Sequence, residues 1–103
     1  MRLILATCSR ERAEPLLMAL LEARLVGCGN LIPGVVSHYW WEGQIERDEE
    51  VVMLMETTVD RVDAATAKLR ELHPYDVPKI LVIDPEQVDP AYAEWLREVT
   101  RAQ

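Results

Sequence analysis

The chain has 103 residues, with 11 Lys and Arg against 18 Asp and Glu, so its formal charge is −7. This length fits one domain, residues 1–103, and a chain that is half hydrophobic and 28% charged has the composition of an ordinary globular protein rather than a disordered one. The acidic balance argues against nucleic-acid binding, and no apolar run approaches the ~20 residues that cross a bilayer.

The first segment of the chain predicts a strand followed by a helix. Residues 3–7 form a short apolar run, which is typical of a buried strand. Ser9 is a candidate N-cap for the helix that follows. Apolar residues then recur at spacings of three and four, which indicates one buried helical stripe: Ala13, Leu16, Leu17, Leu20 and Leu21.

The middle of the chain predicts a long hairpin. A second strand covers residues 28–41, and Pro33-Gly34 interrupts it without ending the apolar pattern, which favours a bend or bulge. Residues 42–44, Glu-Gly-Gln, form the expected turn because Gly43 can adopt a positive φ. The return strand then runs through acidic residues 46–50 into the apolar run 51–55.

The last third predicts two helices around one strand. Thr58 or Asp60 starts a second helix, and the two prolines of residues 73–78 end it. Residues 80–83 form a fourth strand. Asp89 caps a final helix that has a proline at its first position.

This order of elements predicts an α+β, ferredoxin-like βαββαβ fold with an additional C-terminal helix. Right-handed crossovers give an antiparallel sheet with strand order 4-1-3-2, counted along the chain, and a long hairpin between the second and third strands. Three loops then meet at one edge of the sheet and bring Cys8, His73, Tyr75 and Asp76 to the base of the hairpin. Cys28 lies at the other end, roughly 20 Å away, so we expect no disulfide.

The hairpin also predicts an oligomer. Tyr39, Trp40 and Trp41 are consecutive, and successive strand residues face opposite sides. Helices cover one face of the sheet, and no element is left to cover the other. At least one Trp and alternate residues of the run 51–55 would then be exposed in a monomer, so we expect an obligate oligomer that packs sheet against sheet.

Three segments resemble signatures of the CutA divalent-cation tolerance family: Leu25–Gly34 (LVGCGNLIPG), Tyr39–Gly43 (YWWEG) and His73–Pro78 (HPYDVP). The resemblance implies a ferredoxin-like homotrimer similar to PII signalling proteins, located in the bacterial cytoplasm, with a role in tolerance to copper and other divalent cations. The chain departs from the family pattern at three positions, one of which is Glu56, where many members carry Lys. Ala6 stands where members with an assigned copper site have Cys, and Leu72 stands where a second His can occur.

The predicted metal site combines Cys8 and His73, because thiolate and imidazole ligands suit copper or zinc. Asp76 is a candidate third ligand, or a partner subunit supplies one. The alternative interpretation is that His73 caps the carbonyl groups at the end of its own helix.

A second group of residues is expected at an inter-subunit cleft or interface: His38, Tyr39, Trp40, Trp41, Glu42 and Tyr75. His38 could meet its symmetry mates near a trimer centre or lie on the surface. Tyr75, between two prolines, either walls a cleft between subunits or belongs to a plain helix-terminating loop. We expect Cys28 to serve packing, and the acidic residues 46–50 to form a solvated face that protects a strand edge.

The predicted function is a non-enzymatic, cytoplasmic homotrimer that binds divalent metal, with copper favoured, or a small ligand in its inter-subunit clefts. The chain would bind itself and its ligand, but neither nucleic acid nor membrane. One alternative is a trimeric scaffold that anchors a protein partner. Another is an acylphosphatase-like hydrolase, for which Arg10 follows the first strand but the expected glycine-rich loop is missing.

Overall fold

The computed structural model describes residues 1–101; the last two residues of the predicted domain, 102–103, lie outside the described part. The elements in chain order are β1 (Arg2–Cys8), α1 (Arg10–Glu22), β2 (Cys28–Trp41), β3 (Gln44–Thr57), α2 (Val62–Leu72), β4 (Ile80–Ile83) and α3 (Pro90–Val99). Among these residues, no helix has the length and apolar character needed to span a membrane.

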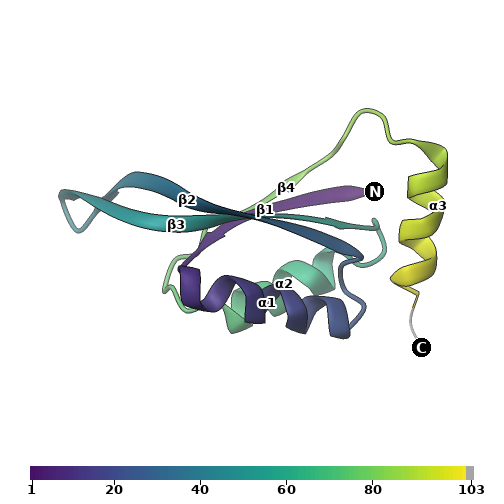
Figure 1. The fold of residues 1–103 in the computed structure, drawn as a ribbon, viewed down its shortest axis with the longest axis horizontal. Helices are drawn as coiled ribbons and strands as arrows, with labels where there is room; N and C mark the ends of the chain where they lie inside the picture. Colours follow the sequence, from purple (N-terminus) through teal and green to yellow (C-terminus); the bar gives the residue numbers. More distant parts are fainter. Residues whose placement is uncertain (102–103) are drawn as a thin grey trace.

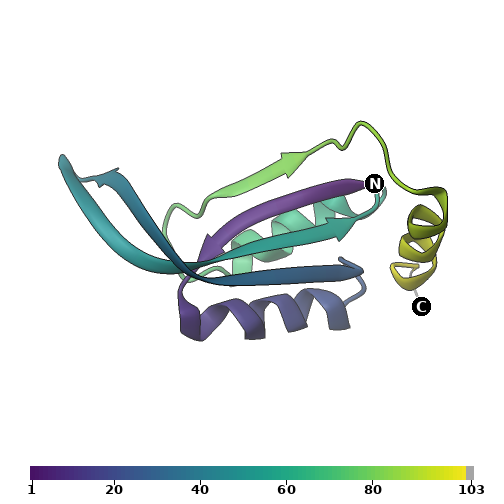
Figure 2. The same ribbon diagram turned by 45° about the horizontal axis from the view of Figure 1, so that its top comes forward.

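The four strands form one antiparallel sheet in the order β2-β3-β1-β4, which confirms the predicted topology. Helices α1 and α2 lie together against one face of the sheet, and α3 lies at the end opposite the hairpin (Figures 1 and 2). The β2–β3 hairpin extends well past the two helices. Its outer half therefore has no helix beneath it.

The core follows the period-two alternation of the central strands. Ile4, Ala6 and Cys8 of β1 are fully buried, while the alternate residues Leu3 and Leu5 are only half-buried; Thr7, where β1 ends, departs from the alternation and is also buried. Strand β3 alternates in the same way. The helix-covered face is therefore made from these residues and the apolar stripes of α1 and α2: Ile4, Ala6, Cys8, Leu16, Leu17, Leu20, Val51, Met53, Met55, Val62, Ala65 and Leu69.

A glycine allows α1 to lie close to β2. A Cβ atom at Gly29 would come within 2.3 Å of the Leu17 Cδ1 atom. Only a residue without a side chain permits this distance between strand and helix. The glycine next to Cys28 therefore sets the spacing between the two layers.

Backbone geometry in the hairpin confirms the predicted bulge and turn. The β2–β3 register shifts between Ile32 and Val35, and Gly34 has φ 74°. At the tip, Glu42 and Gly43 have φ values of 51° and 78°. Two consecutive residues with positive φ match the right-handed twist of the flanking strands, as in a type I′ turn.

The predicted start of the first helix is confirmed, whereas that of the second needs correction. Ser9 is the N-cap of α1, although its side chain makes no capping hydrogen bond; its backbone carbonyl accepts from the N–H groups of Arg12 and Ala13. Helix α2 begins at Val62, later than either Thr58 or Asp60 predicts. The cause is a preceding turn, in which the Thr58 carbonyl accepts from the N–H groups of Arg61 and Val62.

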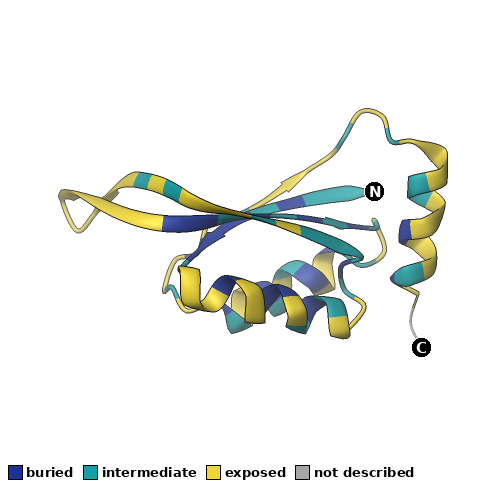
Figure 3. Cartoon of the chain, in the orientation of Figure 1, coloured by how far each residue is buried: buried dark blue, intermediate teal, exposed yellow. Residues whose placement is uncertain are grey.

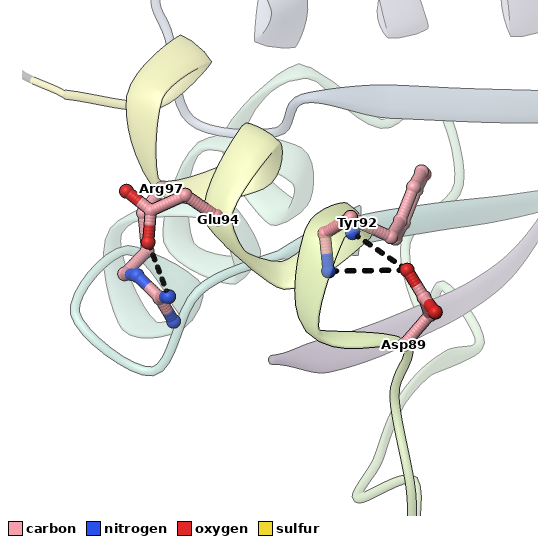
Figure 4. A network of polar contacts seen from close by, with 5 residues as sticks. Asp89, Tyr92, Glu94 and Arg97 are labelled. Carbon is pink, nitrogen blue, oxygen red and sulfur yellow. Dashed lines mark hydrogen bonds and ion pairs between the residues drawn. The ribbon is translucent and has the colours of Figure 1, made fainter.

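Helix α3 is capped by its own sequence at its start and bonded to other elements at its end. The Asp89 carboxylate accepts from the N–H groups of Ala91 and Tyr92 at 3.1 and 3.2 Å, which confirms the predicted cap (Figure 4). At the other end, Arg24 donates to the Val99 carbonyl and Arg61 to the Thr100 carbonyl. Cationic donors suit the negative end of a helix.

Candidate functional site

The end of β1, the base of the hairpin and the α2–β4 loop meet at one edge of the sheet, as predicted. His73 links the first and last of these elements. Its ring is buried, and its Nε2 atom lies 2.8 Å from the Thr7 carbonyl oxygen. The Tyr75 backbone N–H donates to Nδ1 at 3.2 Å.

These two partners assign the state of the His73 ring. A carbonyl oxygen only accepts, so Nε2 must carry a proton, and a backbone N–H only donates, so Nδ1 must lack one. Both nitrogens of the neutral ring are therefore occupied. His73 does cap its own helix, but through its backbone N–H, which donates to the Leu69 carbonyl at 2.9 Å; the ring bonds to the neighbouring strand instead.

Tyr75 joins this loop to the hairpin. Its hydroxyl donates to a carboxylate oxygen of Glu50 at 2.6 Å, and its ring contacts the His73 ring edge-on at a centroid distance of 4.6 Å. Burial, and then the hydrogen bond to Glu50, raise the pKa of Tyr75 well above its ordinary value. The phenol is thus a fixed donor at neutral pH.

Glu50 is the residue of this site that the sequence analysis missed. It was placed with the solvated acidic face, yet only 7% of it is exposed. Strand alternation gives no signal for this burial, because Glu50 directly precedes the buried Val51 and so lies on the opposite face of β3. A buried carboxylate needs a partner, and the Tyr75 hydroxyl supplies it.

Cys8 lies next to this network but faces the core. The residue is fully buried, and burial raises the pKa of its thiol despite opposing effects of Ser9 and Arg12. The thiol form therefore predominates at neutral pH, whereas a metal ligand needs the thiolate. Both Cys8 and Cys28 are free, which confirms the expectation of no disulfide.

Asp76, the third predicted ligand, lies exposed in the α2–β4 loop. In the part of the chain that the structure describes, no three His, Cys, Asp or Glu side chains are grouped as metal ligands. With both His73 nitrogens hydrogen-bonded and Cys8 buried as a thiol, the single chain does not present these three residues as a prearranged metal site.

Apart from Tyr75 in the α2–β4 loop, the predicted interface residues lie along the outer half of the hairpin, which is mostly exposed (Figure 3). Trp40 is 72% exposed, and its cross-strand partner Ile45 is 64% exposed. His38, Tyr39, Trp41 and Glu42 are exposed as well. The Tyr39 hydroxyl donates to the Asp48 carboxylate, which raises the pKa of Tyr39 to about 12.

The face of the sheet opposite α1 and α2 is less exposed at its centre than predicted. Its margin carries exposed apolar side chains. Val52 and Leu54 of β3 are half-buried rather than exposed, because neighbouring strands shield them. At the margin, Leu81 and Ile83 of β4 are 46% and 40% exposed, and Ile32 of β2 is 46% exposed.

The molecule is more extended than a compact monomer of the same mass. Its accessible area is 6706 Å², against about 5,900 Å² for a compact monomer of 11.8 kDa. Its radius of gyration is 14.3 Å, against about 13 Å for a compact chain of this length. The projecting hairpin, along the 45 Å long axis, accounts for the excess.

Another cluster of titratable groups lies at the opposite end of the sheet, where the sequence analysis predicted only packing. Cys28 and Glu56 are directly opposite each other on β2 and β3, and the Tyr92 hydroxyl of α3 lies 3.4 Å from the Glu56 Oε1 atom. The other carboxylate oxygen of Glu56 is buried without a hydrogen-bond partner. Burial raises the pKa of Glu56.

Comparison with known proteins gives one consistent family. The pattern of the CutA1 divalent ion tolerance protein matches residues 2–99. The divalent-cation tolerance protein CutA of Pyrococcus horikoshii is 43% identical over 91 residues, which is 88% of each chain. Protein CutA of mouse is 40% identical over 97 residues, 93% of this chain and 55% of its own length. The chain thus spans about half the length of the mouse and human relatives.

Solved structures agree with the sequence matches. The crystal structure of CutA1 from Pyrococcus horikoshii has a TM-score of 0.93 at 39% identity, covering 98% of this chain and 99% of that one. The divalent ion tolerance protein CutA1 from Ehrlichia chaffeensis gives 0.93 at 34% identity, covering 97% and 94%. The sequence pattern, the relatives and the fold therefore establish that this chain belongs to the CutA1 divalent ion tolerance family.

Proposed function

We propose that the protein acts in divalent-cation tolerance as a non-catalytic, cytoplasmic homotrimer whose ligand is a divalent metal, with copper as the first candidate. The observation that carries the proposal is the exposed apolar hairpin beside the Glu50–Tyr75–His73 network. Its relatives' names support the ligand class, since they describe tolerance of divalent cations and name no reaction.

The trimer is supported by what a single chain leaves uncovered. Trp40 and Ile45 form an exposed apolar pair on the hairpin, and Leu81 and Ile83 are exposed apolar residues on β4, the opposite edge strand. Exposed apolar surface of this kind usually marks an interface. Association of three copies would cover these residues and place the Tyr75 loop beside a neighbouring subunit.

Copper binding by Cys8, His73 and Asp76 requires a rearrangement of the single-chain geometry. The His73 ring must exchange one of its two hydrogen bonds for the metal, and the Cys8 thiol must lose its proton and leave the core. Metal binding should therefore be coupled to proton release and to movement of the α2–β4 loop.

Native mass spectrometry of the reduced protein, titrated with copper and zinc, tests this assignment. We expect a trimer that gains one copper ion per chain, and loss of that ion in Cys8→Ser, His73→Gln or Asp76→Asn. Matched controls are Cys28→Ser and Asp84→Asn, which should retain copper. If the three site variants retain copper while the Cys28 variant loses it, the assignment is wrong.

We also propose that the inter-subunit cleft transmits ligand binding, in the manner of PII proteins. The Tyr75–Glu50 bond is the supporting observation, because it fixes the α2–β4 loop to the hairpin, which in the proposed trimer would contact a neighbouring subunit. Hydrogen exchange of the hairpin, with and without copper, provides the test. Protection that changes in the wild type but not in Tyr75→Phe supports transmission through this bond, whereas equal changes in both exclude it.

A further inference from the structure

A second polar region lies far from the sheet edge described above. A groove of about 420 Å³ is lined by the turn before α2 and the end of α3: Thr58, Asp60, Arg61, Arg97, Thr100 and Arg101. Thr57, at the end of β3, pairs with Arg2 at the start of β1, whereas the His73 ring contacts Thr7 near the end of β1. The groove and the His73 network therefore lie at opposite ends of the sheet.

The charge of this groove is opposite to that of the protein. Three arginines and one aspartate give its lining a formal charge of +2, while the whole chain carries −7. A cluster of arginines on an acidic protein creates a local positive potential, which attracts anions to that part of the surface. Arginine is also the side chain whose planar fork of donors matches the oxygens of phosphate groups and carboxylates.

Arg61 is held in place rather than free to move. Its Nε–H donates to the Thr100 carbonyl at 2.8 Å, and this uses one of its five N–H donors. That bond also neutralises the negative end of α3, which would otherwise oppose an anion in the groove. The guanidinium group is thus oriented by the protein before any ligand arrives.

Arg97 lies in the last turn of α3 and lines the same groove. Its Nη2 atom pairs with Glu94 at 2.7 Å, and the side chain is 59% exposed (Figure 4). The hydrogen bond and charge of Arg97, with a smaller contribution from Arg101, lower the pKa of Glu94. The charges of Arg97 and Arg101 therefore both reach Glu94, so the two side chains lie in the same part of the groove.

The turn before α2 also brings one acidic side chain into the groove. Asp60 is the one carboxylate among the groove residues, and it could accept from a ligand hydroxyl.

We infer that this groove is a binding site for a small phosphate-bearing molecule, with Arg61, Arg97 and Arg101 contacting the phosphate oxygens. A tetrahedral phosphate offers several oxygens to donors from different directions, whereas a carboxylate offers two oxygens in one plane. The volume is that of a site for a small organic ligand rather than for a bare ion. The inference is independent of the proposed metal site.

Isothermal titration calorimetry with pyrophosphate tests the site, with succinate as the planar dicarboxylate for comparison. We expect one pyrophosphate per chain, and roughly tenfold weaker binding in Arg97→Gln and in Arg101→Gln, since each removes a charge-assisted contact. Lys68→Gln is the matched control: it removes the same charge from exposed α2 surface outside the groove and should bind like the wild type. Circular dichroism confirms that each variant is folded.

Three results would overturn the inference. The first is no heat of binding with millimolar pyrophosphate. The second is equal weakening by Lys68→Gln, which would mean attraction to overall charge rather than to this groove. The third is tighter binding of succinate, which would exclude phosphate as the ligand class. Copper titration of the same variants separates this site from the metal proposal, because Arg97→Gln should leave copper binding unchanged.

Discussion

At the scale of single residues, the polar groups that matter are the buried ones. His73 and Glu50 each have a specific hydrogen-bond partner on another element, and Glu56 keeps one carboxylate oxygen without any. A buried polar group contributes to stability only when it is satisfied, so these residues should respond differently to substitution.

His73→Phe should destabilise the protein by about 2–4 kcal/mol, because it leaves the Thr7 carbonyl and the Tyr75 N–H without their partner. Guanidinium denaturation at fixed protein concentration measures this difference. Glu22→Phe is the control, since Glu22 is exposed at the end of α1 and lies away from the hairpin; its effect should stay within about 0.5 kcal/mol. Equal effects of the two substitutions would show that the ring bonds of His73 contribute nothing specific.

Glu56→Gln should stabilise the protein at neutral pH and have no effect in acid. Burial raises the folded-state pKa of Glu56, so the folded state holds a proton that the unfolded state releases. The folded state therefore pays a free-energy penalty for ionising Glu56. This penalty is absent at pH values below the unfolded-state pKa and complete at pH values above the folded-state pKa. Solvent still screens the half-buried side chain, so we expect a gain of at most about 1 kcal/mol.

Denaturation of the Glu56→Gln variant and the wild type at pH 7 and at pH 4 gives the comparison. The stability difference should shrink towards zero at the lower pH. A difference of the same size at both pH values would mean that the effect comes from packing rather than from ionisation.

At the scale of elements, the sequence predicts those whose ends have a local chemical cause. Asp89 followed by Pro90 marks the start of α3, and Gly43 marks the hairpin tip; both are confirmed. The start of α2 was missed because the Thr58 carbonyl forms a turn first, and several residues there could have begun a helix. The burial of Glu50 was missed because it depends on Tyr75, which is 25 residues away in sequence.

Asp89→Ala should destabilise the protein by about 1 kcal/mol, since two N–H groups at the start of α3 lose their acceptor. Asp84→Ala is the matched control, because the Asp84 carboxylate is 71% exposed and forms only a surface ion pair with Arg2. Such pairs contribute little, so the control should change stability by less than about 0.5 kcal/mol. A larger loss in the control than in the Asp89 variant would contradict the capping role.

At the scale of the whole molecule, the sequence predicts the sheet topology because patterning and right-handed connections leave few alternatives. The geometry of the predicted metal site is harder to predict than the topology. The order of the elements brings Cys8 and His73 to one edge of the sheet, but it does not show which way each side chain points. Cys8 faces the core by strand alternation, and the His73 ring is held by the backbone of β1. Neither fact follows from a pair of residue types.

Replacing the exposed apolar residues of the outer sheet should weaken association without unfolding the chain. In Trp40→Ser/Ile45→Ser, the two apolar side chains on the hairpin become polar while the core below α1 and α2 is untouched. We expect smaller species in sedimentation velocity, with a far-ultraviolet circular dichroism spectrum like that of the wild type. Val59→Ser, also exposed but outside the hairpin, is the control and should sediment like the wild type.

The most direct test of the account is the mass of the native protein in solution at micromolar concentration. The proposed trimer has three times the chain mass of 11.8 kDa, which is about 35 kDa. Native mass spectrometry of the reduced, metal-free protein should give that mass and retain it when copper is added. A single species at the mass of one chain would contradict the trimer and the inter-subunit cleft that depends on it.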